Sequence, residues 1–180
     1  MADKSLKART DAKLRYARIH LEEFKTQPPG RGHDFERSHQ EAFLAQLFGA
    51  YAALLQELNI DLGCDLASEN VTLGGMHRAL KEQGRTSPQL AELYELENNS
   101  ASWFGRAKCM RNHTTHIGGI PLAFYVKVGG KDDRPTSFLD PKTREELPGD
   151  ATDVLASWLS EMESLVHRVR EGVGTVSKAC

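Results

Sequence analysis

Long apolar runs are missing from this chain of 180 residues. No stretch approaches the roughly 18 consecutive apolar residues that a membrane-spanning helix requires. The N-terminus also lacks the apolar segment that forms the core of a secretory signal peptide. We therefore expect a cytoplasmic protein with no membrane partner.

Cysteine is scarce, with three residues in the whole chain, Cys64, Cys109 and Cys180. An odd number without framework spacing excludes the disulfide-rich scaffold of small secreted proteins. We expect reduced thiols in a reducing compartment.

An excess of positive charge is also absent, because 23 Lys and Arg stand against 25 Asp and Glu. The net charge of −2 excludes a protein that coats nucleic acid through a broadly basic surface. Any contact with nucleic acid must therefore be local. A basic stretch does run from Lys4 to Arg18, and we interpret it as the solvated face of a helix.

The composition of the chain is typical of one folded domain. Hydrophobic residues make up 39% and charged residues 27%, which is ordinary for a globular protein and too apolar for a disordered one. The length suits a single domain with a real core. We therefore treat residues 1–180 as one unit.

Apolar residues recur every three or four positions along much of the chain, which is the spacing of one helix face. The pattern is strongest between Leu44 and Leu58, which predicts a helix at the centre of a bundle. Ser38, with Glu41 three residues later, resembles a capping box and marks the expected start of that helix. Further helices are predicted over about 4–26, 76–83, 88–98, 103–116 and 152–171.

Serine residues mark the starts of two of these helices. Ser87 followed by Pro88 is typical of an N-cap with proline at the first helical position. Ser100 or Ser102 is expected to cap the helix over 103–116.

Three segments depart from the helical pattern. Residues 59–72 contain Gly, Asp and Asn and are predicted to form a loop. Residues 122–128 alternate as a strand does, and with 136–139 they predict a β-hairpin within a loop insertion at about 122–147. The tail over 173–180 is expected to be loose.

Polar groups gather at the end of one predicted helix, where Arg111 to His116 read Arg-Asn-His-Thr-Thr-His. Cleaving RNA without a metal requires a group that moves protons and a cation that stabilises the charge on phosphorus. Histidine titrates near neutral pH, and the arginine fork matches phosphate oxygens. We therefore assign catalysis to Arg111 and His116, with Asn112 orienting either one. His113 and Thr115 are candidates for secondary roles.

The spacing of Arg111 and His116 limits how they can act together. Five positions along a continuous helix point two side chains about 140 degrees apart. Either the helix unwinds before Gly118, or a two-fold axis brings two copies of the motif together. The second solution predicts a composite site in a homodimer.

Arg111, Asn112, three further residues and then His116, at a helix end in a small all-helical chain, resemble the signature of the HEPN superfamily. That signature is Arg, four to six residues and then His, often with Asn, Asp or His after the Arg. The resemblance implies an all-α, four- to five-helix bundle that dimerises with its motifs facing across the interface. It also implies a metal-independent endoribonuclease, commonly a toxin or an antiviral-defence effector.

The resemblance further implies RNA as substrate, no cofactor, and an antitoxin or sensor protein as a partner. Some members carry Tyr two residues after the motif His, where an antitoxin attaches AMP. Gly118 stands at that position here, so this mode of silencing is not supported. The predicted hairpin is an addition to the core pattern of the family.

Other interpretations of the same residues stay open. Arg111 and His116 would also stabilise the negative end of a helix dipole without any chemistry. The chain would then be a non-catalytic, HEPN-like module that binds a nucleotide or a protein. Cys109, His113 and His116 share one helix face and would suit zinc, although Cys109 is expected to be a small buried residue.

The other histidines carry no partner pattern and are expected at the surface or at helix caps, namely His20, His39, His77 and His167.

Overall fold

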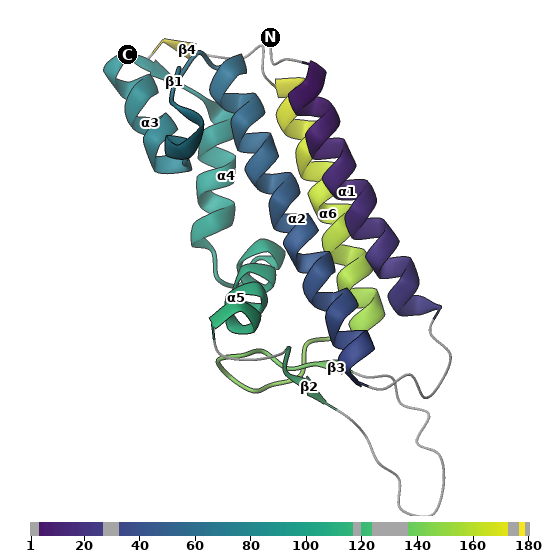
Figure 1. Ribbon diagram of the computed structural model, residues 1–180. Coiled ribbons are helices and arrows are strands. Elements are labelled where there is room, and N and C mark those ends of the chain that lie inside the picture. The colour runs from purple at the N-terminus through teal and green to yellow at the C-terminus, as the bar shows by residue number, and fades with distance from the viewer. Residues whose placement is uncertain (1–3, 27–32, 117–119, 124–136, 173–176, 179–180) are drawn as a thin grey trace, which may run out of the picture.

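The computed structural model describes residues 4–26, 33–116, 120–123, 137–172 and 177–178. These residues form six α-helices and a short 3₁₀ helix, η1 (Ser68–Asn70), so the predicted all-α class is confirmed (Figure 1). Six is one more than the largest number that the HEPN resemblance implies. The α-helices are α1 (Lys4–Lys25), α2 (His33–Asp61), α3 (Leu73–Glu82), α4 (Pro88–Asn98), α5 (Trp103–His116) and α6 (Ala151–Gly172).

Three long helices, α1, α2 and α6, lie side by side and form the body of the molecule (Figure 1). α3 lies at one end of this body, and α5 lies toward the other end. Among the described helices, none combines the length and the apolar composition that crossing a bilayer requires.

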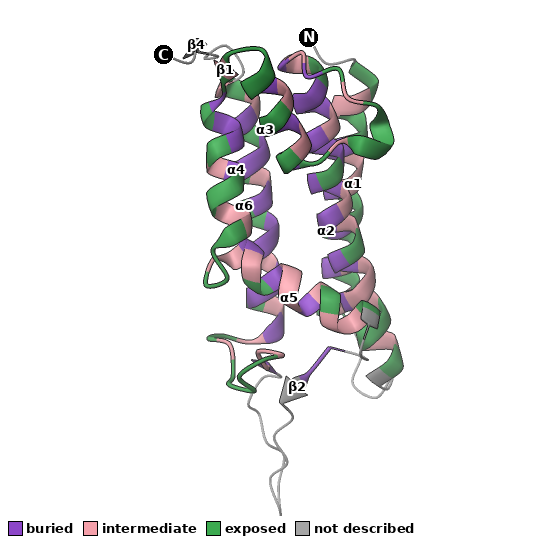
Figure 2. Cartoon of the chain, turned by 90° about the vertical axis from the view of Figure 1, so that its left-hand side faces the viewer, coloured by how far each residue is buried: buried purple, intermediate pink, exposed green. Residues whose placement is uncertain are grey.

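α2 is the central helix, as its apolar spacing predicted, because it contacts α1, α5 and α6. The helices turn their buried faces toward one another (Figure 2). Each fully buried Leu contributes about 1.5–3 kcal/mol through the removal of apolar surface from water. The predicted apolar face of α2 is buried along its whole length, at Leu44, Leu47, Phe48, Tyr51, Leu54, Leu55 and Leu58.

Two of the predicted helix starts are confirmed by their caps. The Ser87 hydroxyl accepts a hydrogen bond from the Leu90 amide at 3.4 Å, and Pro88 is the first helical residue of α4. The Ser102 hydroxyl accepts one from the Gly105 amide at 2.9 Å, so Ser102 caps α5.

The predicted start of α2 at Ser38 is wrong, because α2 begins at His33. Ser38 lies inside the helix, where its hydroxyl donates to the Phe35 carbonyl oxygen at 2.7 Å. Asp34 and Glu36 lie in the first turn, where their negative charges stabilise the positive end of the helix dipole. These acidic residues favour the earlier start.

The loop predicted over 59–72 is shorter than expected. α2 continues to Asp61, and η1 occupies part of the remainder. The buried side chain of Asn59 binds both backbone groups of Leu66, donating to its carbonyl at 2.9 Å and accepting from its amide at 3.0 Å. A polar residue is therefore retained in the helix because the loop satisfies its hydrogen bonds.

The predicted hairpin is present at its base. β2 (Leu122–Ala123) pairs antiparallel with β3 (Ser137–Phe138) at the end of the bundle near α5 (Figure 1). The buried Phe138 ring stacks on Trp158 of α6, with 6.1 Å between centroids, and ties this insertion to the core. The segment 124–136, which would carry the turn, is not among the described residues.

The tail after Gly172 was expected to be loose, but part of it is paired. β4 (Ser177–Lys178) pairs antiparallel with β1 (Arg85–Thr86) at the opposite end from β2 and β3. Its backbone groups obtain in this ladder the hydrogen bonds that a free tail would make with water.

A buried ion network joins α1, α2 and α6. The Arg170 guanidinium donates from Nε and Nη2 to the two carboxylate oxygens of Glu57, both at 2.9 Å, and from Nη1 to Asp11 at 2.8 Å. Thr10 donates to the same Glu57 carboxylate. Glu57 is only 1% exposed, so its charge depends on these partners.

Candidate functional site

The motif residues lie in the last two turns of α5. The helix is unbroken from Trp103 to His116, so it does not unwind between Arg111 and His116. At about 100 degrees per residue, positions 111 and 116 therefore lie about 140 degrees apart around the axis of the continuous helix. The side chain of His116 is outside the part of the structure that is described.

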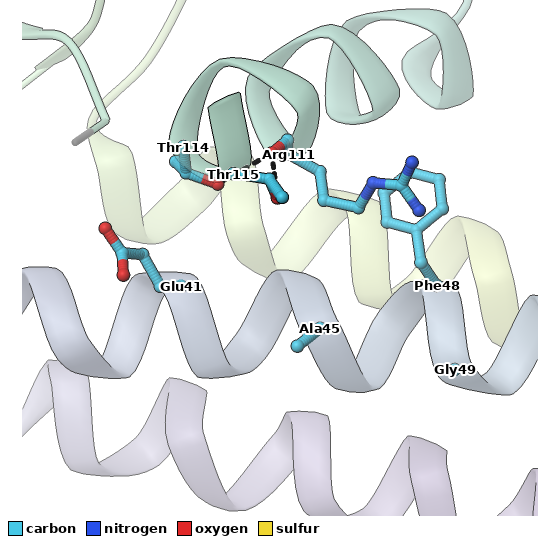
Figure 3. A pocket seen from close by; sticks show the side chains of 7 residues that line it. All are labelled: Glu41, Ala45, Phe48, Gly49, Arg111, Thr114 and Thr115. Carbon is cyan, nitrogen blue, oxygen red and sulfur yellow. Dashed lines mark hydrogen bonds between the residues drawn. The ribbon is translucent and has the colours of Figure 1, made fainter. Parts of the chain in front are cut away.

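A hollow of about 540 Å³ separates the end of α5 from α2 (Figure 3). α5 contributes Arg111, Thr114 and Thr115 to its walls, and α2 contributes Glu41, Ala45, Phe48 and Gly49. The structure therefore places Arg111 and Thr115, both predicted as site residues, around one space.

Neutral groups hold the Arg111 side chain. The Asn112 side-chain oxygen accepts hydrogen bonds from Nε at 3.2 Å and from Nη2 at 2.7 Å. The guanidinium carbon lies 4.8 Å from the centre of the Phe48 ring, which attracts the cation through its π electrons (Figure 3). Among the described residues, no carboxylate forms an ion pair with Arg111. Its positive charge is therefore free to bind an anion in the hollow.

The hydroxyls of Thr114 and Thr115 are engaged with the helix backbone. They donate to the Arg111 carbonyl oxygen at 2.7 and 2.9 Å (Figure 3). Because their protons are already used, these hydroxyls can only accept further hydrogen bonds from a ligand. Thr115 therefore supplies an acceptor to the wall of the hollow.

Glu41 lines the end of the hollow that lies away from the Arg111 guanidinium (Figure 3). It forms an ion pair with Arg37 one turn earlier, with 3.5 Å between Nε and Oε1. Its carboxylate is thus partly compensated by its own helix and does not neutralise Arg111.

A second hollow, of about 460 Å³, lies on another face of α5 and is lined by three other predicted residues. Asn112, His113 and Cys109 all line it. The His113 Nδ1 atom is buried and has no hydrogen-bond partner among the described residues. Cys109, expected to be buried, is partly exposed in this wall. Arg111 and His113 therefore face different spaces, and Asn112 connects the two.

The zinc interpretation finds two of its three residues on this second wall. Cys109 and His113 line the same hollow, as their spacing of one turn predicted. Within the described part of the chain, no three His, Cys, Asp or Glu side chains lie close enough together to hold a metal ion. The third proposed ligand, the His116 side chain, lies outside the described part of the chain, so the zinc interpretation stays a prediction.

Two of the histidines expected at the surface or at helix caps contact each other. The Nδ1 atoms of His20 on α1 and His39 on α2 are 3.3 Å apart, and the Phe35 ring packs against His39. Burial, and then the neighbouring His39, lower the pKa of His20 below its usual 6.5. His77 packs edge-on against Tyr94, and His167 pairs with Glu171 in α6.

Sequence reasoning missed Phe48 and Glu41 as site residues. Phe48 lies within the apolar stretch from Leu44 to Leu58 and Glu41 within the expected capping box, and neither lies near the motif in the sequence. No local pattern marks a contact between two helices, so only the packing of α5 on α2 reveals them.

No protein-family model, curated protein or solved structure matches this chain. Its function is therefore inferred from the chemistry of α5 and its surroundings.

Proposed function

We propose that this chain is a metal-independent endoribonuclease of HEPN-like type that cuts RNA at the end of α5. The observation that supports this proposal is the environment of the Arg111 guanidinium. Its guanidinium is positioned by Asn112 and Phe48, has no carboxylate partner among the described residues, and borders a hollow wide enough for a nucleotide.

Arg111 would bind the scissile phosphate. Two parallel N–H donors of a guanidinium match two non-bridging phosphate oxygens, and their charge stabilises the pentavalent transition state. Asn112 already occupies Nε and Nη2, so it sets the direction in which the remaining donors point.

His116 would act as the proton carrier. The 2′-hydroxyl attacks phosphorus and passes its proton to water, the bond from phosphorus to the 5′ oxygen breaks, and the His116 imidazolium protonates that leaving oxygen and is left as a neutral imidazole. The products are a 2′,3′-cyclic phosphate and a free 5′-hydroxyl. Proton transfer of this kind typically contributes about 10²–10⁴ in rate.

A homodimer would complete the site. Because α5 is continuous, positions 111 and 116 of one copy lie on different sides of the helix, whereas a two-fold axis can bring two motifs around one phosphate. Among the described residues, the large hydrophobic side chains that are exposed lie on α1, α2 and α4, namely Tyr16, Ile19, Ile60 and Tyr94. The described surface of α5 would therefore contribute polar contacts to such an interface.

The direct test incubates the purified protein with end-labelled RNA in the presence of EDTA. We expect fragments ending in a 2′,3′-cyclic phosphate, at the same rate with and without the chelator. Binding of RNA without cleavage would favour the alternative, a non-catalytic module that uses the same hollow. Loss of cleavage on chelation with recovery in zinc would instead favour the site of Cys109, His113 and His116.

The dimer is tested by mixing two inactive variants, Arg111→Ala and His116→Ala. In a composite site, each mixed dimer retains one intact Arg and one intact His at a shared phosphate, so cleavage should partly recover. A chain that sediments as a monomer at micromolar concentration and still cuts RNA would refute the composite site.

The biological role proposed with this activity is that of a toxin or an antiviral-defence effector. An unregulated ribonuclease would damage its own cell, so an antitoxin or a sensor protein is expected as a partner. Co-purification of the chain with the products of adjacent genes would test this expectation.

A further inference from the structure

A second surface with free positive charge lies between α3 and the start of α4. It is a groove of about 680 Å³, here called the α3–α4 groove, lined by His77, Arg78, Lys81, Arg85, Thr86 and Ser87, with apolar walls. It lies at the end of the bundle opposite β2 and β3 (Figure 1).

The cations of the α3–α4 groove have no carboxylate partner among the described residues. No carboxylate lines the groove, and the side chains of Arg78 and Lys81 form no ion pair with the described residues. Arg85 donates from Nη1 to the neutral Gln83 side chain at 2.7 Å. Three positive charges are thus gathered on a chain whose net charge is −2, which indicates a local site for an anion.

An aromatic surface adjoins these cations. The Tyr94 side chain on α4 is 54% exposed, and its ring contacts His77 edge-on with 5.6 Å between centroids. An exposed ring beside spaced cations suits a single-stranded nucleic acid, because bases stack on the ring while phosphates pair with the cations. An acidic peptide would use the charges but not the ring.

We propose that the α3–α4 groove binds the phosphate backbone of single-stranded RNA at a distance from the cleavage site. This proposal rests on the proposed ribonuclease function, whose substrate the groove would hold. α4 separates the groove from α5, and its 11 residues span about 16 Å at about 1.5 Å per residue. A stacked strand rises about 3.4 Å per nucleotide, so the length of α4 alone corresponds to about five nucleotides, and the part of α5 before Arg111 adds to that number.

Binding is measured with a fluorescent, 20-nucleotide 2′-O-methyl RNA, which cannot be cleaved because its 2′ oxygen is blocked. The double variant Arg78→Ala/Lys81→Ala is expected to bind roughly tenfold more weakly in low salt. Losing two phosphate contacts should also reduce the slope of log affinity against log salt by about 1.4. The matched control, Arg9→Ala/Arg15→Ala, removes two exposed cations from α1 and should leave the slope unchanged.

Cleavage kinetics separate the groove from the catalytic site. With long RNA, the Arg78→Ala/Lys81→Ala variant should show a raised KM and an unchanged kcat, because the lost contacts hold substrate and transition state equally. With a trinucleotide, which is too short to reach the groove, the variant should match the wild type.

Two outcomes would overturn the groove assignment. One is an unchanged affinity and salt slope in the Arg78→Ala/Lys81→Ala variant, with Arg111→Ala still abolishing cleavage, which leaves the ribonuclease proposal intact. The other is displacement of the RNA by a decaglutamate peptide at concentrations below those of an unlabelled RNA competitor, which would assign the groove to an acidic protein. Tight, groove-dependent binding of RNA that is never cut would instead refute the ribonuclease proposal and retain the groove.

Discussion

Arg170 lies in the last turn of α6 and Arg111 in the last two turns of α5, and among the described residues Arg170 is surrounded by negative charge whereas Arg111 is surrounded by neutral groups. Arg170 is surrounded by the carboxylates of Glu57 and Asp11 and by the Lys7 carbonyl oxygen, which together occupy all three of its nitrogen atoms. Arg111 meets an amide oxygen and a phenyl ring. One guanidinium is neutralised by the fold, and the other is not.

This difference in surroundings indicates that Arg170 has a structural role and that Arg111 is a candidate for a functional one. The side chain of Arg170 is 23% exposed and joins three helices, so its charge stabilises the buried Glu57. A free guanidinium contributes much less to folding, and packing alone does not require it. Because neutral groups position Arg111, its cation remains available for an external anion. Such departures from the arrangement that would be most stable locally are typical of ligand-binding sites.

The largest effect is expected from Arg170→Ala, in the free energy of unfolding. Removing the guanidinium leaves Glu57 buried without its cation, which typically costs about 3–5 kcal/mol. Urea denaturation followed by circular dichroism measures the loss. Cleavage by the remaining folded protein should be nearly unchanged, because Arg170 contacts Lys7, Asp11 and Glu57 and does not line the hollow beside α5.

The matched control is Arg168→Ala in the same helix. Arg168 pairs with Glu92 at 3.0 Å, but the two side chains are 52% and 42% exposed. An exposed pair contributes about 0–1 kcal/mol, so this variant should unfold close to the wild type. If Arg168→Ala and Arg170→Ala lower the free energy of unfolding equally, the buried network stabilises the chain no more than an exposed ion pair does.

The next effect reverses the comparison, because Arg111→Ala should change activity and not stability. Losing a donor that stabilises a transition-state oxyanion typically costs about 10²–10³ in rate, whereas truncation at a partly exposed helix end changes stability little. His116→Ala should have a similar effect on cleavage. Single-turnover cleavage of labelled RNA and urea denaturation measure the two quantities, and cleavage that survives Arg111→Ala would remove the assignment.

The sequence predicts the Arg111 motif but not the ion network of Arg170. The motif at Arg111 is contained in six consecutive residues, and the caps at Ser87 and Ser102 are local patterns, so sequence reasoning found them. The network of Arg170 joins residues from α1, α2 and α6 that are far apart along the chain. No spacing rule could connect them, because their contact is a product of packing.

The same limit explains the errors around the hollow. Ser38 and Glu41 fit the capping-box pattern, but Asp34 and Glu36 provided an earlier helix start that the pattern did not weigh. The apolar spacing of α2 correctly predicts that Phe48 is buried. The spacing shows only which face of α2 is buried, and it does not show that the Arg111 side chain of another helix lies over the Phe48 ring.

A smaller effect is expected when Arg111 is given the kind of partner that Arg170 has. Ala45 is exposed on α2 and lines the hollow beside Arg111 (Figure 3). Ala45→Glu would place a carboxylate in that space, where charges about 4 Å apart interact by about 1–4 kcal/mol. We expect cleavage to fall by about tenfold through weaker phosphate binding.

Ala45→Gln is the control, because it has the same shape without the charge and should cleave RNA like the wild type. Raising the salt concentration should partly restore the Ala45→Glu variant relative to Ala45→Gln, since screening weakens an exposed ion pair. Equal cleavage by the two variants at low salt would contradict the view that the free charge of Arg111 matters.

The smallest effect is expected in the pH dependence of stability, and it arises from the contact of His20 with His39 between α1 and α2. Protonating both rings would put two positive charges about 3 Å apart, so the folded chain favours the neutral form of His20. Burial and His39 lower its pKa from the usual 6.5, and Glu23 opposes them in part. Below about pH 6.5 the unfolded chain therefore binds more protons at this residue than the folded chain does, and stability falls as the pH falls.

Urea denaturation at pH 7.5, 6.5 and 5.5 measures this dependence. The His20→Gln variant has no titrating group at this position. Its free energy of unfolding should therefore decline less between pH 6.5 and 5.5 than that of the wild type. His167→Gln is the matched control, because His167 is 72% exposed on α6 and pairs with Glu171. The pH profile of that variant should follow the wild type above about pH 5.5. If His20→Gln and the wild type lose stability in parallel, the two rings tolerate each other's charge, and the contact between α1 and α2 carries no electrostatic cost at acid pH.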